Sequence, residues 1–358
     1  MSEYNNLIRT ALIGFGFVGK TFHAPLIRSV PGLELSVVSS RHPEKVREDL
    51  PAAKVVADPE EAATHSEVDL VVIASPNETH VPLATAALSA GKHVVVDKPF
   101  TITLAEARRL GELSQAKGRL LSVFQNRRWD SEFLAARTII EEGRLGEVLH
   151  FESRLDRFRP EVRKRWREVA GPGAGLWYDL GPHLADQALQ LFGLPEKITA
   201  KLVRQRPQAQ TDDWFHVLLD YGRLQAILHG SLMVAGGTAR MAIHGTLGSW
   251  LKYGLDVQEE QLVRGVVPGE SSWGEDPRPG IFYSGSNNET LELPAPKGDH
   301  RQYYFGIRDA LLNQGPNPVT PLQAIAVMAV LETAIESSAK GQALSLPLTN
   351  QERADWRA

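Results

Sequence analysis

The sequence contains no cysteine. This absence excludes a disulfide framework, a thiolate zinc site and a cysteine nucleophile together. A strong charge of one sign is also missing, because 39 basic and 43 acidic residues leave a formal net charge of −4. Nucleic-acid backbones require concentrated positive charge, so we expect no nucleic-acid partner.

Long hydrophobic runs are missing as well. No stretch approaches the roughly 18 apolar residues of a membrane span, and residues 1–9 lack the apolar run of a signal peptide. We therefore expect a cytoplasmic protein that does not bind a membrane. With 42% hydrophobic and 23% charged residues, the composition is that of a globular protein. At 358 residues the chain suits two domains.

Short apolar runs alternate with helix-like segments in the first third of the chain. The runs are rich in Val, Ile and Leu and lack the in–out alternation of a half-exposed strand. We expect strands at 10–13, 35–39, 70–74 and 93–96, and helices at 20–29, 43–49, 82–90 and 104–116. This repeated strand–helix pattern predicts a doubly wound Rossmann α/β domain with a parallel sheet over residues 1–123.

The pattern changes in the rest of the chain. We expect strands at 148–157, 198–203, 214–221, 224–233, 239–244 and 249–253, and helices at 131–142, 182–192, 300–312 and 321–337. Successive strands without helices between them predict a mostly antiparallel sheet in an α+β domain over residues 124–358. Residues 268–299 are rich in Gly, Pro, Ser and Asn, so we expect loops and turns there.

A glycine-rich loop follows the first expected strand and opens a helix. In such a loop the first glycine makes a tight turn, the second lets the backbone approach a pyrophosphate, and the third lets helix and strand pack closely. The helix N-terminus offers N–H groups and a positive dipole end to the anion. A merely structural turn is the alternative. We expect a dinucleotide site formed by Gly14, Phe15, Gly16, Phe17 and Val18, with Gly19 as the third glycine.

The end of the second expected strand bears on the choice of cofactor. An NAD enzyme usually places Asp or Glu there, about 20 residues after the loop, to bind the ribose 2′-hydroxyl. Here the sequence offers Ser39, Ser40 and Arg41, so two hydroxyls and a guanidinium are available to a 2′-phosphate. The alternative is that Arg41 only caps a solvated loop. We expect NADP rather than NAD.

Three further motifs lie downstream of the glycine loop. The strand at 70–74 is followed by Ser75-Pro76-Asn77-Glu78-Thr79-His80, the strand at 93–96 by Asp97-Lys98-Pro99, and residues 173–183 read Gly-Ala-Gly-Leu-Trp-Tyr-Asp-Leu-Gly-Pro-His. Together with the loop, these motifs resemble the Gfo/Idh/MocA family of sugar and inositol oxidoreductases over nearly the whole chain. Residues 124–130, Phe-Gln-Asn-Arg-Arg-Trp-Asp, resemble the branch that holds NADP-dependent scyllo-inositol dehydrogenases.

The resemblance implies catalytic roles for Lys98, Asp179 and His183. The family's Glu-Lys-Pro motif falls on residues 97–99, with the shorter Asp97 in place of glutamate, and the resemblance implies that Asp97 and Lys98 also contact the cofactor. Ala174 replaces the middle glycine of the second motif, which weakens any claim that this position needs a positive φ. The family also implies a large open sheet in the C-terminal domain, whose exposed face pairs subunits into homodimers or homotetramers.

Oxidation of a secondary alcohol requires a group that takes the hydroxyl proton while hydride leaves carbon. Imidazole titrates near neutrality, so His183 is the candidate, and Asp179 can orient the ring or bind a substrate hydroxyl. Pro182 is tolerated in a first helical turn, so we expect a helix that begins at Pro182 and places His183 near its positive dipole end. A packing histidine is the alternative for His183.

Lys98 follows an expected buried strand, at the sheet edge where doubly wound folds place ligands. Its ammonium can polarise a carbonyl oxygen and stabilise alkoxide character as hydride moves, which leaves no role for a metal. We therefore expect no metal site. The Lys98–Pro99 bond is a candidate cis peptide.

Several residues allow two interpretations. Ser75, Pro76, Asn77 and His80 either contact the cofactor, with Asn77 and His80 on its nicotinamide side, or form a turn and helix cap. Asn126, Arg127 and Tyr178 either bind substrate or fill packing and ion-pair positions, as do Arg128 and Trp129. A basic run either attracts an anion or forms a solvated or subunit-contact face; it comprises Arg154, Arg157, Arg159, Arg163, Lys164, Arg165 and Arg167.

The sequence thus predicts an NADP-dependent dehydrogenase acting on an inositol, sugar or related polyol. Two alternatives stay open. Some relatives use a tightly held cofactor for hydrolase or lyase chemistry on sugars through transient oxidation. A non-catalytic nucleotide-sensing protein is the other alternative, and the retained Lys98, Asp179 and His183 argue against it.

Overall fold

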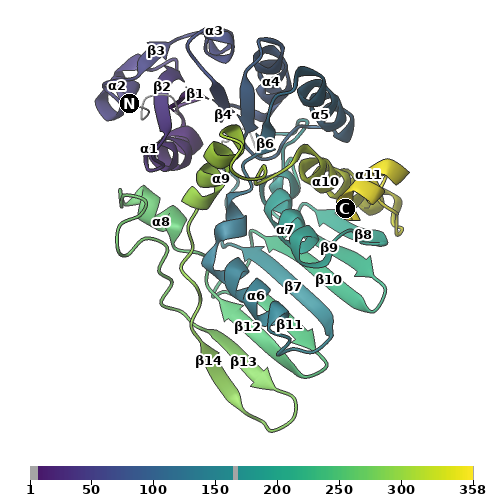
Figure 1. Cartoon of the computed structure of the whole chain (residues 1–358). Coiled ribbons are helices and arrows are strands. Elements are labelled where there is room, and N and C mark those ends of the chain that lie inside the picture. The colour runs from purple at the N-terminus through teal and green to yellow at the C-terminus, as the bar shows by residue number, and fades with distance from the viewer. Residues whose placement is uncertain (1–6, 164–167, 358) are drawn as a thin grey trace. The chain divides into compact units, whose positions relative to one another are not determined.

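The computed structural model describes residues 7–163 and 168–357. They form two compact units (Figure 1). The first unit holds the described residues up to Asn126 together with Gln258–Trp273 and Asp299–Ile325, and the second unit holds the remainder. This division differs from the ranges 1–123 and 124–358 expected from the sequence, because two later segments fold with the first unit.

The first unit is built on a six-stranded sheet in the order β3-β2-β1-β4-β5-β6. All neighbouring strands are parallel, as the continuous apolar runs predict. The strand order reverses between β1 and β4, the place where doubly wound sheets bind ligands. The strands are β1 (Ile8–Ile13), β2 (Leu33–Ser39), β3 (Lys54–Val56), β4 (Leu70–Ile73), β5 (His93–Val96) and β6 (Leu121–Val123).

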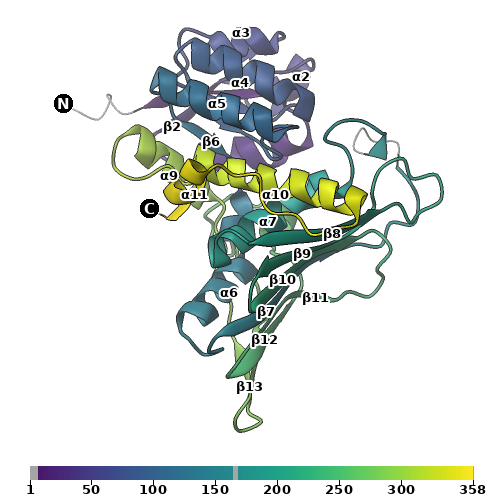
Figure 2. The same ribbon diagram turned by 90° about the vertical axis from the view of Figure 1, so that its right-hand side faces the viewer.

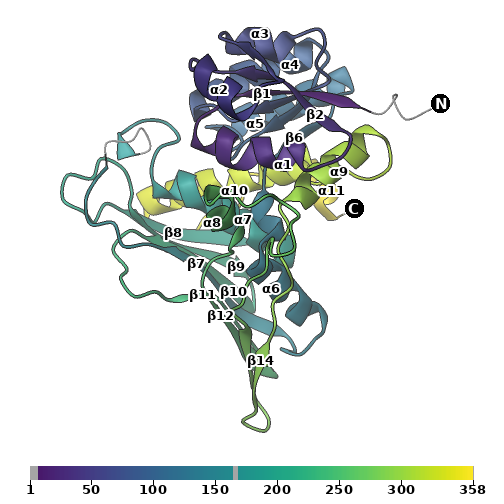
Figure 3. The same cartoon turned by 90° about the vertical axis from the view of Figure 1, so that its left-hand side faces the viewer.

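Helices cover both faces of this sheet, with α1 on one face and α3 and α4 on the other (Figure 3). Helix α5 shows how the sequence sets a boundary: Thr103 and Glu106 form a capping box at its start, and Gly118 ends it at φ +58°. The helices are α1 (Ala24–Arg28), α2 (Pro43–Asp49), α3 (Pro59–Thr64), α4 (His80–Ser89), α5 (Leu104–Lys117), α8 (Gln258–Val263) and α9 (Arg301–Leu311).

The second unit is built on an eight-stranded sheet in the order β14-β13-β12-β11-β7-β10-β9-β8. Its pairs are antiparallel except β7 with β10, so the expected mostly antiparallel sheet is confirmed. The strands are β7 (Val148–Asp156), β8 (Lys197–Val203), β9 (Trp214–Tyr221), β10 (Leu224–Ser231), β11 (Ala239–Gly245), β12 (Gly248–Tyr253), β13 (Gly280–Ser284) and β14 (Thr290–Leu293).

Helices α6 (Ser131–Glu141) and α7 (Leu176–Phe192) lie on one face of this sheet (Figure 2). Alternate residues of β9, such as Phe215 and Val217, are buried on the face that α7 covers. Helix α10 (Pro321–Lys340) is long and apolar enough to cross a membrane by composition alone, yet 61% of that stretch is buried. Burial of this kind is typical of the core helix of a soluble protein.

The outer strand β8 is protected at its edge. Ser337 and Ser338, at the end of α10, accept hydrogen bonds from the backbone N–H groups of Ala200 and Leu202 at 3.0 and 2.9 Å. An exposed strand edge invites pairing with another chain, and side-chain acceptors occupy this one. The last helix, α11 (Asn350–Arg357), follows in the sequence.

Some expectations from the sequence are wrong. Residues 268–299 are not only loops, because β13 and β14 form a hairpin there. The alternation of Gly280–Ser284 is masked by the surrounding Gly, Pro and Ser residues. The three-residue strands β3 and β6 and the helices α3, α8 and α11 are too short to show a period in the sequence.

Candidate functional site

The glycine loop turns sharply between β1 and the next helix. Gly14 has φ +99°, and a Cβ there would lie 2.6 Å from the carbonyl oxygen of Ala74. A Cβ on Gly19 would clash with the carbonyl oxygen of Gly14. A Cβ on Gly16 would meet no atom of the described chain within 4 Å, so open space lies beside this backbone. The tight turn at Gly14 and the close packing at Gly19 match the expected loop geometry, and binding of a pyrophosphate over Gly16 stays a prediction.

The helix after the loop contains a π-helical stretch, η1 (Gly19–His23), and continues as α1. The backbone N–H of Lys20 donates to the carbonyl of Gly16 at 2.9 Å. The N–H groups that precede Lys20 in this turn lie outside the helical ladder and are available to an anion. Phe17 is exposed, whereas Phe15 and Val18 are half-buried. This backbone fits a dinucleotide pyrophosphate.

The end of β2 carries the residues that we expect to determine cofactor specificity. Ser39 is buried, and its carbonyl accepts a 3.1 Å hydrogen bond from Gly14 N–H, which places the strand end beside the loop. Ser40 is half-buried, and Arg41 is exposed. Over residues 7–163 and 168–357, no ion pair engages the Arg41 guanidinium. These groups stand at the sheet edge where a ribose phosphate binds in doubly wound folds.

The loop after β4 is a short 3-10 helix, η2 (Asn77–Thr79), that leads into α4. Asn77 is buried and Pro76 is exposed, while the hydroxyls of Ser75 and Thr79 are 2.5 Å apart. The ring of His80 is buried, with Nε2 3.0 Å from the carbonyl oxygen of Ser75 and Nδ1 3.0 Å from that of Pro99. His80 therefore bridges the loops that follow β4 and β5.

The loop after β5 carries Asp97 and Lys98. Asp97 is buried and Lys98 is half-buried, and the Lys98–Pro99 peptide is cis. Burial alone would raise the pKa of Asp97, but the His23 ring, followed by the charges of Lys98 and His80, outweighs burial and lowers it. Asp97 is therefore a buried carboxylate beside the lysine.

Sequence reasoning missed two residues behind Asp97. His23 and Tyr304 are fully buried, with Nδ1 of His23 2.5 Å from the Tyr304 hydroxyl and Nε2 3.8 Å from a carboxylate oxygen of Asp97. Tyr304 lies on α9, 281 positions away in the chain. The π-helical turn that positions His23 carries no readable sequence signal.

The second unit holds the motif at residues 173–183. Gly173 and Gly175 have φ values of +71° and +101°, and Ala174 is not among the residues with positive φ. A Cβ on Gly175 would clash with the carboxylate of Asp212, which accepts a 2.7 Å hydrogen bond from Trp177 N–H. Burial raises the pKa of Asp212 to about 6, although hydrogen bonds from backbone N–H groups such as that of Trp177 act to lower it.

The expectation that a helix starts at Pro182 is wrong. Helix α7 begins at Leu176, because Gly175 turns the chain and Asp212 caps the first turn. Pro182 lies inside the helix and cannot donate a bond to the carbonyl of Tyr178. His183 is consequently two turns in, and the helix dipole acts on Asp179 in the first turn instead.

The three residues of α7 that the sequence analysis assigned to the site are not equally exposed. Tyr178 and His183 are buried and Asp179 is half-buried. Asp179, His183 and Gln187 are spaced four residues apart and share one helix face. Gln187, which the sequence analysis missed, donates a 2.9 Å bond to the Arg127 carbonyl and accepts a 3.0 Å bond from Arg240.

The arginines after β6 make ion pairs. The Arg128 guanidinium binds both carboxylate oxygens of Asp186 at 2.8 and 2.6 Å, and both groups are buried. Arg127 donates to Asp130 at 2.9 Å. The Arg128–Asp186 ion pair therefore holds α7 to the segment before α6.

Asn126 lies in the first unit. Its side-chain amide is buried 3.3 Å from Nδ1 of His300.

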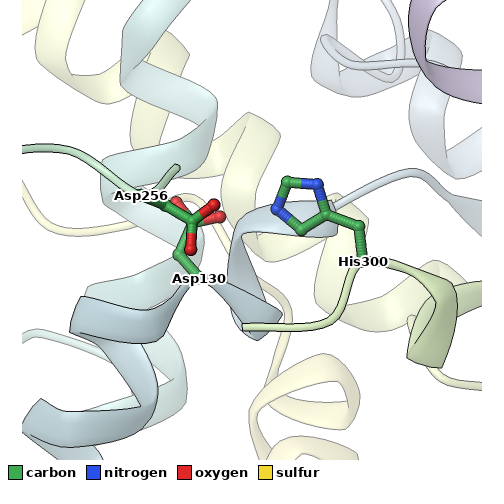
Figure 4. Close-up of side chains that lie close together, drawn as sticks. All are labelled: Asp130, Asp256 and His300. Carbon is green, nitrogen blue, oxygen red and sulfur yellow. The ribbon is translucent and has the colours of Figure 1, made fainter. Parts of the chain in front are cut away.

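Carboxylates gather at the start of α6. Oxygen atoms of Asp130 and Asp256 lie within 4.8 Å of one another, and Asp256 caps the helix through a 2.8 Å bond from Ser131 N–H; Figure 4 labels both, together with His300 of the first unit. Glu132 is fully buried 3.2 Å from Arg240. Burial, followed by the charge of Asp130, raises the pKa of Glu132 to about 8.

The structure describes Arg154, Arg157, Arg159 and Arg163 of the basic run. Arg154 pairs with Glu152 at 2.9 Å, and the backbone N–H groups of Arg157 and Arg159 bind the carbonyls of Ser231 and Leu232. Lys164, Arg165 and Arg167 lie outside the described residues.

Comparisons with known proteins identify the family. The profile of the oxidoreductase family's NAD-binding Rossmann fold (GFO_IDH_MocA) matches residues 8–125, and that of its C-terminal alpha/beta domain matches residues 137–347. The uncharacterised oxidoreductase YdgJ of Escherichia coli is 52% identical over 92% of this chain and 96% of its own.

Two further relatives match almost throughout. The NADP(+)-dependent scyllo-inositol 2-dehydrogenase IolW of Bacillus subtilis is 39% identical over 95% of this chain and 96% of its own. A crystal structure from Klebsiella pneumoniae, described as an oxidoreductase, is 56% identical, covers 99% of both chains and has a TM-score of 0.93. The chain therefore belongs to the Gfo/Idh/MocA family of oxidoreductases and carries that family's NAD(P)-binding Rossmann domain.

Proposed function

We propose that this protein is an NADP-dependent dehydrogenase that moves hydride between the nicotinamide and a secondary alcohol or ketone of an inositol, sugar or related polyol. The observation that carries the proposal is the 39% identity to the scyllo-inositol dehydrogenase IolW along 95% of the chain. The glycine loop and the end of β2 support it from this protein's own residues.

Arg41 and Ser40 are proposed to select NADP. A carboxylate at the end of β2 would repel a 2′-phosphate, and no carboxylate stands at residues 39–42. The exposed Arg41 guanidinium offers a planar set of N–H donors that suits phosphate oxygens. The pyrophosphate is proposed to bind over Gly16, where the backbone is open.

Lys98 is proposed to bind the oxygen of the reacting carbon. The bound cofactor supplies the hydride acceptor or donor. The Lys98 ammonium stabilises negative charge that grows on the substrate oxygen, and Asp97 balances that ammonium. His183 is proposed to accept or return the hydroxyl proton, and Asp179 to orient a substrate hydroxyl or the ring.

A substrate panel tests this function directly. NADP and NAD are compared on scyllo-inositol, other inositols and aldoses, while absorbance of the reduced nicotinamide is followed. We expect turnover of at least one polyol, with a strong preference for NADP. Absence of turnover across the panel, with cofactor surviving purification and exchanging no hydride with added nucleotide, would contradict the proposal and favour hydrolase or lyase chemistry.

A further inference from the structure

A buried row of polar groups stands behind the carboxylate of Asp97. The Tyr304 hydroxyl lies 2.5 Å from Nδ1 of His23, and Nε2 of His23 lies 3.8 Å from the Asp97 carboxylate. Tyr304 and His23 are fully buried, and Asp97 is 6% exposed. The three residues come from α9, the π-helical turn after the glycine loop, and the end of β5.

The short contact between the Tyr304 hydroxyl and Nδ1 of His23 allows the phenol to donate to the ring. Burial raises the pKa of Tyr304 well above its ordinary value, so the phenol keeps its proton and can donate it to Nδ1. A neutral imidazole that accepts at Nδ1 carries its own proton at Nε2. Nε2 lies 3.8 Å from the Asp97 carboxylate, beyond hydrogen-bond distance, so its N–H favours the carboxylate over the carboxylic acid through electrostatic attraction.

We propose that Tyr304 and His23 are positioning residues that hold Asp97 as a carboxylate, whose negative charge in turn strengthens the hold of the Lys98 ammonium on its proton. The inference rests on the proposed role of Lys98 in binding the substrate oxygen. An ammonium stabilises growing negative charge, whereas a neutral amine does not. The row therefore connects α9 and the helix of the glycine loop to the charge of the reacting lysine.

Other groups face Asp97 as well. His80 approaches from α4 and Lys98 is its neighbour in the chain, and both lower the pKa of Asp97. Tyr303, next to Tyr304 on α9, donates to Ser122 at 2.9 Å. The ring of Phe124 packs on His23 with centroids 4.3 Å apart and carries no charge. Phe124 is thus a matched control for loss of packing without loss of the donor.

The ionisation of Lys98 can be measured without substrate or cofactor. The full-length protein is acetylated competitively at a series of alkaline pH values, and labelling is read by mass spectrometry. The pH at which Lys98 is half-labelled is the labelling midpoint. The exposed Lys117 serves as internal reference. Asp97→Asn removes the carboxylate and gives the full effect, which we expect to be a fall of about one to three pH units in the labelling midpoint of Lys98. His23→Leu is expected to lower the same midpoint by about one pH unit, so that Lys98 is labelled roughly tenfold faster below the midpoint.

Three further variants separate the effect of this polar row from simple packing. His23→Gln retains an N–H donor and is expected to stay near the wild-type midpoint, whereas Tyr304→Phe, which loses a single oxygen, should lower it. Phe124→Leu should reduce thermal stability and leave the midpoint unchanged. If Asp97→Asn shifts Lys98 but His23→Leu and Tyr304→Phe do not, the proposal is wrong; Tyr304→Phe decides alone if His23→Leu does not fold. Because acetylation reads the amine itself, this result is independent of whether polyols are turned over.

Discussion

The carboxylate of Asp212 accepts a 2.7 Å hydrogen bond from the backbone N–H of Trp177. Asp212 precedes β9, whereas Trp177 lies in the first turn of α7, so the bond joins segments 35 residues apart. It satisfies one of the N–H groups that every helix leaves open at its start. The turn that it closes also carries Asp179.

Removal of this cap is expected to loosen the start of α7. Asp212→Ala should lower the free energy of unfolding by about 1 kcal/mol and speed hydrogen exchange of the amides at 176–180. Asp212→Asn keeps an acceptor oxygen and serves as the control. Equal exchange rates in wild type and the alanine variant would show that Gly175 alone sets the helix start.

The raised pKa of Glu132 predicts that the stability of the folded protein depends on pH. Its pKa is raised to about 8 in the folded protein, above the ordinary 4.5, so the folded state holds the proton where the unfolded state has lost it. This contribution to stability is complete below the unfolded pKa and is lost as pH rises through about 8. Urea unfolding of Glu132→Gln should lack this fall between acid and mildly alkaline pH. The same fall in both proteins would assign it to another group.

The buried pair of Arg128 and Asp186 predicts a strong non-additivity. Arg128→Met leaves the Asp186 carboxylate buried without its bidentate partner and should cost about 3–5 kcal/mol of unfolding free energy. The double variant Arg128→Met/Asp186→Leu should recover most of that loss, because no charge is left uncompensated. If the double variant lost as much unfolding free energy as the two single variants together, the broken ion pair would not be the cause of the loss in Arg128→Met.

The parallel sheet and the glycine loop could be predicted because their signals are local. Four-residue apolar runs such as Leu70–Ile73 and the spacing of Gly14, Gly16 and Gly19 are readable without tertiary information. The start of α7 could not be predicted, because Asp212 caps it from 35 positions away. His23 was missed for the same reason: its partner Tyr304 is brought to it only by the fold.

Arg41 predicts a selective loss of cofactor affinity. A charge-assisted hydrogen bond to the 2′-phosphate is worth about 1.5–3 kcal/mol, so Arg41→Ala should weaken NADPH binding roughly tenfold to a hundredfold and leave NADH binding nearly unchanged. His42→Ala alters the next exposed side chain and serves as the control. Titration of protein fluorescence measures both affinities. Equal losses for the two cofactors would remove the argument for phosphate recognition.

The most direct test of the reaction assigned to this protein is the turnover of Lys98→Met on a polyol that the wild type oxidises, together with its affinity for NADPH. Methionine keeps an unbranched side chain as far as Cε and removes the ammonium. We expect turnover to fall about a hundredfold to a thousandfold, the scale for losing one donor that stabilises growing negative charge, while NADPH binds with nearly wild-type affinity. Near-normal turnover would contradict the role of Lys98.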